Sequence, residues 1–150
     1  MKLNGKLALA VPAPVAAEAF RDAGVLAQFL PGTSELTRSG PSTFDFMVIK
    51  DIGVMTLRLP GTLAVVALGQ GLRFDANAKH LLGGSATLML YLEFAPDGAG
   101  CVLSYDGTLE STGLVGRALR DRADQVQTVL AARIAAVTAR IEKTHRSRTA

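Results

Sequence analysis

The chain has 150 residues, a length typical of one domain, and 49% of them are hydrophobic although it contains no tryptophan. Its single cysteine, Cys101, excludes an internal disulfide and a cysteine-based zinc site, and it fits a reducing compartment such as the cytoplasm. The net charge of +3 arises from residues 133–150, because the rest of the chain sums to −1, so no basic stripe indicates nucleic-acid binding.

The first predicted element is a strand. Residues 2–11 alternate between apolar and polar side chains, as a half-buried strand does. A basic and then apolar start can also resemble a secretory signal, but Pro12 and Pro14 interrupt the apolar run. Pro14 instead suits the first turn of a helix, so we interpret this segment as part of the fold.

Two short helices are expected between residues 14 and 30. The segment is rich in alanine, and Gly24 is expected to separate the two helices. The sequence Leu30-Pro31-Gly32 predicts where the helical segment ends. Proline disfavours helical geometry at the residue before it, and glycine permits a sharp exit.

Six further strands are predicted between residues 34 and 110. Each alternates in hydrophobicity and is bounded by turn residues. A tight turn is expected at Asp51–Gly53, and Pro60-Gly61 predicts a bend or bulge inside a long strand. The predicted strands cover residues 34–39, 43–50, 54–67, 71–79, 85–95 and 101–110.

The C-terminal part of the chain has the period of one long amphipathic helix. This helix is predicted over residues 114–143, with Val126 and Leu130 on its apolar stripe and charged residues outside it. Residues 144–150 are expected to form a basic, disordered tail.

A sheet with one apolar face must cover that face, and the long helix is the only predicted element of suitable length. The order of strand, two short helices, six strands and long helix therefore predicts an α+β, helix-grip fold. In this fold a curved antiparallel sheet of about seven strands wraps around the C-terminal helix. We expect it to form a single domain over residues 1–143.

No catalytic constellation is visible in the sequence. The two histidines, His80 and His145, stand in a predicted turn and in the predicted tail, without carboxylates at metal-ligand spacing. Cys101 is interpreted as a core thiol, because a nucleophilic cysteine needs a basic partner. We therefore predict no metal site, no catalytic residue and no required cofactor.

The inward faces of the predicted strands are aliphatic or phenylalanine, which favours an apolar ligand. If the long helix stands away from the sheet, these side chains line a cavity. If it packs closely, they are only core, and both interpretations stay open. The candidate lining residues are Phe29, Leu30, Phe44, Phe46, Leu72, Phe74, Leu88, Leu90, Leu103, Tyr105, Val126 and Leu130.

Four short segments follow each other in a characteristic order: Leu30-Pro31-Gly32, Ile52-Gly53, Pro60-Gly61-Thr62 and the segment from Asp106-Gly107 to Gly113 and Gly116. In their order and spacing the chain resembles the CoxG family of carbon monoxide dehydrogenase accessory proteins. That family belongs to the START-like, polyketide-cyclase-like superfamily, whose fold is the helix grip. One departure is Thr33, which stands where the family often has cysteine.

This resemblance implies a cytoplasmic, non-catalytic accessory protein that links a molybdenum hydroxylase to the membrane. It also implies an apolar cavity that holds a quinone- or lipid-like molecule. The basic residues of 144–150 would add a weak contact with the inner face of the membrane, at about 1 kcal/mol per basic residue near an anionic leaflet.

Two other interpretations stay open. An enzyme of the cyclase or dehydratase type found in the same superfamily would need a pocket-facing acid or base. The candidates are Glu93, Glu110, Tyr91 and Tyr105, although strand parity puts both glutamates on the polar face. A purely structural partner would use an exposed face of the long helix and hold no ligand.

Overall fold

A computed structural model describes residues 1–29, 35–52, 55–80 and 83–149 of the chain. Over these ranges seven strands form one antiparallel sheet in the order β1-β7-β6-β5-β4-β3-β2. The strands are β1 (Lys2–Leu9), β2 (Glu35–Arg38), β3 (Thr43–Ile52), β4 (Met55–Leu68), β5 (Gly71–His80), β6 (Gly84–Asp97) and β7 (Gly100–Thr112).

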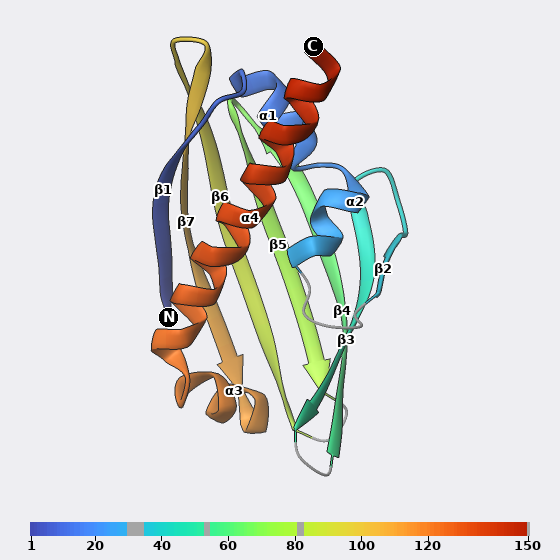
Figure 1. The fold of residues 1–150 in the computed structure, drawn as a ribbon. Helices are drawn as coiled ribbons and strands as arrows, with labels where there is room; N and C mark the ends of the chain where they lie inside the picture. Colours follow the sequence, from blue (N-terminus) through green and yellow to red (C-terminus); the bar gives the residue numbers. More distant parts are fainter. Residues whose placement is uncertain (30–34, 53–54, 81–82, 150) are drawn as a thin grey trace.

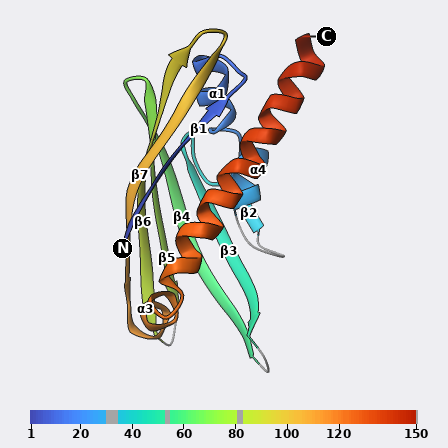
Figure 2. The same ribbon diagram turned by 60° about the vertical axis from the view of Figure 1, so that its left-hand side comes forward.

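Short helices follow the first strand, and a long helix follows the last one. The helices are α1 (Ala13–Ala19), α2 (Ala23–Leu26), the 3-10 helix η1 (Ala27–Phe29), α3 (Gly113–Arg120) and α4 (Ala123–Thr149). Helices α1, α2 and α4 lie on one face of the sheet, and α4 crosses this face diagonally (Figures 1 and 2). The predicted helix-grip fold is therefore confirmed.

The strand register explains why this face is apolar. Val65 pairs with Phe74, Phe74 pairs with Leu90, and Leu92 pairs with Tyr105. Residues that pair across antiparallel strands project to the same face, so these side chains form one continuous surface under the helices. We call this surface the inner face, and the predicted strand parity places the apolar residues on it correctly.

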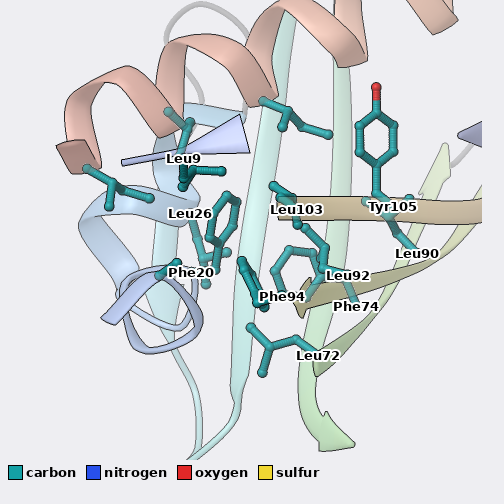
Figure 3. Packing of buried hydrophobic residues seen from close by; sticks show 14 of the residues in the cluster. Leu9, Phe20, Leu26, Leu72, Phe74, Leu90, Leu92, Phe94, Leu103 and Tyr105 are labelled. Atoms are coloured by element: carbon teal, nitrogen blue, oxygen red, sulfur yellow. The ribbon is translucent and has the colours of Figure 1, made fainter. Parts of the chain in front are cut away.

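Phe20, the residue after α1, lies at the centre of the core (Figure 3). It is fully buried, and its ring centroid lies 5.5 Å from that of Phe94 on β6 and 6.1 Å from that of Phe29 on η1. From the other side α4 adds Ile134 and Val137, which are also buried. Helices α1 and α4 are therefore joined to one end of the sheet by a tightly packed apolar core.

Helix α4 is also attached along the free edge of the sheet. Gln127 Nε2 donates to the carbonyl oxygen of Asn4 at 3.3 Å, and the amide of Ala10 donates to Glu142 Oε1 at 3.4 Å. The two backbone groups are separated by ~20 Å of extended chain and the two side chains by ~22 Å of helix. Because these spans match, α4 runs alongside β1 and satisfies backbone groups that an edge strand leaves unpaired.

The helical regions differ from the prediction in three places. The first two helices separate at Asp22 instead of Gly24, because the Asp22 carboxylate accepts from the amide of Val25 at 3.2 Å and caps α2. The long helix is broken between α3 and α4, at Asp121 and Arg122. This break lets α3 pack against β6 and β7 while α4 takes a different direction (Figure 1).

The third difference concerns residues 144–150, which were expected to be a disordered tail. Helix α4 continues through Thr149 instead. No glycine or proline follows residue 143 to end the helix. The last turn carries Arg146 and Arg148, whose positive charges stabilise the helix by interacting with the negative end of its dipole.

At Pro60-Gly61 a bend or bulge was predicted, and the structure has no bulge between β3 and β4, because the two strands stay in register from Thr43–Ala64 to Ile52–Met55. The strand accepts Pro60 for a local reason. Pairing between β4 and β5 begins only at Gly61, so the nitrogen of Pro60, which faces that side, has no ladder bond to make. Of the predicted turn at Asp51–Gly53, Asp51 and Ile52 belong to β3 instead, and residue 53 lies outside the described ranges.

Replacing Phe20 by alanine tests the packed end of the fold. We expect this substitution to lower the free energy of unfolding by about 3–5 kcal/mol, since it leaves a cavity between Phe94 and Phe29. Urea denaturation of both proteins measures the change. Val129→Ala on the exposed surface of α4 is the control and should stay within about 0.5 kcal/mol of the parent. A similar cost for both variants would contradict the central position of Phe20.

Candidate ligand-binding site

The inner face changes from packed to half-open along its length. On β5, Leu72 and Phe74 are buried, while the next two inward residues, Ala76 and Ala78, are only half-buried. The same change occurs on β6 between Leu90, which is 3% exposed, and Leu88, which is half-buried. Burial therefore decreases in one direction across neighbouring strands.

Helix α4 follows the same gradient. Ile134, Val137 and Ile141 are buried over the packed end, whereas Val126 and Leu130 near the start of the helix are half-buried. Since both the sheet and the helix lose burial toward the same end, an apolar surface stays partly uncovered there. We call this part of the inner face the open end, and its half-buried members include Phe46, Leu63, Ala76, Leu88, Val126 and Leu130.

The predicted lining residues fall into two groups. Those at the packed end are core side chains: Phe44, Leu72, Phe74, Leu90, Leu103 and Tyr105. Those that are half-buried are Phe29, Phe46, Leu88, Val126 and Leu130. Leu30 lies outside the described residues.

The sequence-based prediction missed two residues of the open end. Leu63 and Ala76 pair with each other, and Ala76 also pairs with Leu88. Their parity was visible in the sequence, but a half-buried position was not, because it depends on where the covering helices stop.

At two places on the inner face an aromatic ring lies directly over a glycine of the neighbouring strand. The ring of Phe46 lies over the Cα of Gly61, where any side chain would collide with it. The ring of Tyr105 lies over Gly5 in the same way. Each glycine thus lets an aromatic ring lie flat on the sheet, which keeps the floor of the inner face smooth and apolar.

Tyr105 supplies the polar group of the inner face that was a candidate for acid–base chemistry. Its side chain is 6% exposed, and its hydroxyl points away from β7 (Figure 3). The other three candidates, Tyr91, Glu93 and Glu110, are exposed on the opposite face of the sheet. Tyr91 also contacts Arg73, whose guanidinium is bonded to Asp75 at 2.9 Å.

Metal and thiol chemistry find little support in the described part of the chain. Within residues 1–29, 35–52, 55–80 and 83–149, no group of three or more histidine, cysteine, aspartate or glutamate side chains is placed to hold a metal ion. Cys101 is 1% exposed, and burial raises the pKa of its thiol, which disfavours the reactive thiolate. None of the described helices is long and apolar enough to cross a bilayer.

A trough of about 720 Å³ crosses the opposite, outer face of the sheet. Its two walls follow the strand register, one through Asp45, Thr62 and Asn77 and the other through Met47 and Pro60. The exposed surface of its walls is more apolar than polar, and the trough is open to solvent. By strand parity most of its lining side chains, such as Thr62 and Lys79, belong to the outer face, although Phe46 and Ala78 of the inner face border the trough too. We therefore do not assign it to the apolar site.

No family model matches the sequence, and no curated protein matches it. Solved structures do match the fold. A conserved protein from Geobacillus kaustophilus superimposes with a TM-score of 0.77 at 14% identity, covering 96% of this chain and 97% of that one.

Two further solved structures are informative about the class of fold. The ZhuI aromatase/cyclase from Streptomyces sp. R1128 has a TM-score of 0.63 at 15% identity, with 95% of this chain and 94% of that chain covered. The STAR-related lipid transfer protein from Xanthomonas axonopodis has a TM-score of 0.61 at 14% identity, with 92% and 84% covered. The chain therefore has a START-like, helix-grip fold.

Neighbouring leucines on β6 test the difference between the two ends. Leu90→Ala should lower the free energy of unfolding by about 2–5 kcal/mol, because Leu90 belongs to the packed core. Leu88→Ala should cost no more than about half as much, since less of its surface is buried. Chemical denaturation of the two variants measures both. Equal costs would mean that Leu88 is ordinary core and that the open end does not exist.

Proposed function

We propose that this protein is a non-catalytic binding protein that holds an apolar small molecule at the open end of the inner face. The observation that carries the proposal is the shared loss of burial between Leu90 and Leu88 on the sheet and between Ile134 and Leu130 on α4. Partly uncovered apolar surface of this kind gains free energy when a ligand removes it from water, at roughly 25 cal/mol per Å².

The chemistry of the lining defines the ligand class. The open end contributes aliphatic side chains and the ring of Phe46, and His80, the last residue of β5, has the same inward parity. Tyr105 lies deeper, in the packed core. Such a surface suits a ligand with a large apolar body and few hydrogen-bonding atoms, which is the chemistry of a lipid or of a quinone with an alkyl chain. The lipid-transfer protein with a similar fold supports this proposal.

A finer role rests on the sequence resemblance alone. As an accessory factor of a molybdenum hydroxylase of the carbon monoxide dehydrogenase type, the protein would present a bound quinone- or lipid-like molecule in the cytoplasm, near the membrane. Two of the segments behind this resemblance, at residues 30–32 and 53, lie wholly or partly outside the described residues. Binding of the small molecule is therefore the part of the proposal to be tested first.

Native mass spectrometry of the freshly purified protein, followed by solvent extraction, tests the proposal directly. We expect an added mass that is released as a lipid or quinone. Decylubiquinone and oleate are then titrated into the extracted protein, and each binding event should raise the melting temperature, because it stabilises the folded state. A clean unliganded mass together with no thermal shift for either compound would contradict the proposal.

A matched pair of substitutions on β5 locates the site. Ala76→Phe places a ring on the inner face between Leu63 and Leu88, where it would occupy the space of the ligand. We expect it to weaken decylubiquinone binding by roughly tenfold, a loss similar to the cost of adding a large side chain to a packed core. Lys79→Phe adds the same ring to the exposed outer face of the same strand and should leave affinity unchanged. Isothermal titration calorimetry compares the two. Equal affinities would move the ligand away from the open end.

Tyr105 favours one alternative, an enzyme of the cyclase type, because its hydroxyl lies on the inner face and a cyclase shares the fold. In that case Tyr105→Phe would abolish turnover of an aromatic polyketide substrate without weakening its binding. In the binding role, the same variant has no turnover to lose.

A further inference from the structure

A second concave surface lies away from the inner face, where α1 and α2 face the C-terminal half of α4. This groove has a volume of about 710 Å³, within the range of small-molecule sites. Its apolar floor includes Val15, Ala19, Val25 and Ile141. Phe20 and the packed core lie behind this floor, so the groove and the open end are separate surfaces.

The walls of the groove are rich in positive charge. Four arginines line it, namely Arg21, Arg38, Arg140 and Arg148, against two carboxylates, Glu18 and Asp22. Both carboxylates already have partners, because Glu18 lies 3.8 Å from Arg21 and Asp22 caps α2. The guanidinium of Arg38 donates to the carbonyl of Pro41 and lies 4.8 Å from the ring centroid of Phe44.

The two remaining arginines belong to one face of α4. Arg140, Thr144 and Arg148 follow each other at intervals of four residues, so their side chains form a row along the groove. Within the described residues neither Arg140 nor Arg148 has an ion-pair or hydrogen-bond partner. Two guanidiniums with a hydroxyl between them are suited to bind a phosphate or carboxylate.

We propose that this groove binds an amphipathic organic anion, such as an alkyl phosphate or a fatty-acid carboxylate. The anionic head would bind to the row of Arg140, Thr144 and Arg148, and the alkyl chain would cover the apolar floor around Val15 and Val25. This site is independent of the proposed function, because it shares no residue with the open end of the inner face.

Dodecyl phosphate, kept below its critical micelle concentration, is the probe. Isothermal titration calorimetry should show binding that weakens by about tenfold in the double variant Arg140→Gln/Arg148→Gln, which removes charge-assisted hydrogen bonds to the head group. The control Arg117→Gln/Arg120→Gln removes the same charge from exposed positions on α3 and should bind like the parent. Circular dichroism checks that both variants keep their helices.

Methyl NMR separates this site from the open end. Dodecyl phosphate should shift the methyl signals of Val15 and Val25 in the parent and lose this effect in the Arg140→Gln/Arg148→Gln variant. Shifts confined to Leu88 and Leu130 would overturn the groove site while supporting the open end. Failure of decylubiquinone to bind would leave the Val15 and Val25 shifts unchanged, so the two proposals fail separately.

Three further ligands define the chemistry. Dodecanol has the same alkyl chain as dodecyl phosphate but no charge. It should bind at least tenfold more weakly, because it cannot form charge-assisted hydrogen bonds with the arginines. Equally tight binding of dodecanol, or of inorganic phosphate alone, would overturn an amphipathic site. Vesicles of phosphatidylcholine and phosphatidylglycerol test whether the protein binds a membrane surface instead of a monomeric ligand. Binding to these vesicles without any binding of monomeric dodecyl phosphate would also overturn the proposal.

Discussion

The structure depends on one constraint, which is that a single curved sheet has an apolar face that only its own helices can cover. Helix α4 meets this constraint in two ways. It adds Ile134 and Val137 to the core, and its Gln127 and Glu142 bond to backbone groups along the edge strand β1. These edge bonds fix the direction of α4 along β1, while α1 packs against β6 and β7 and α2 packs against β2. Where those short helices end, coverage of the inner face ends as well.

The enzyme and the binding protein of this fold class differ in what the inner face offers to a ligand. Catalysis by proton transfer needs a positioned acid or base whose pKa suits the task. Of the four candidate residues, Tyr105 lies on the inner face. Tyr91, Glu93 and Glu110 lie on the opposite face of the sheet and are exposed to solvent. Tyr105 itself belongs to the packed core and not to the open end. His80, which was expected in a turn, is the last residue of β5 and has the same inward parity as Ala76 and Ala78. The binding role therefore rests on the apolar surface of the open end and not on a lack of polar groups.

The fold could be predicted from the sequence because strand parity and helical period are local signals. Alternation over residues 71–79 identifies both the strand and its inward residues, and the structure agrees. The break at Asp121 and Arg122 has no glycine or proline to mark it, and it arises from packing of α3 on β6 and β7. The half-burial of Leu88 and Leu130 has no local signal either. It depends on the lengths of helices that are distant in sequence, so the predicted lining mixed core residues with open-end residues.

Helix α4 takes part in both proposed sites, with Val126 and Leu130 near its start and with Arg140, Thr144 and Arg148 near its end. Between them lie Ile134 and Val137, which are packed against the sheet with almost no exposure. Protein cores of this density do not repack easily, and on the two sides of this segment the helix is bonded to Asn4 of β1 and to Ala10, the residue after β1. A ligand at one end therefore has no second arrangement of α4 to select. Since the sites share no contacts and are separated by this core, their binding free energies should add independently. Coupling between them would require α4 to leave the edge of β1.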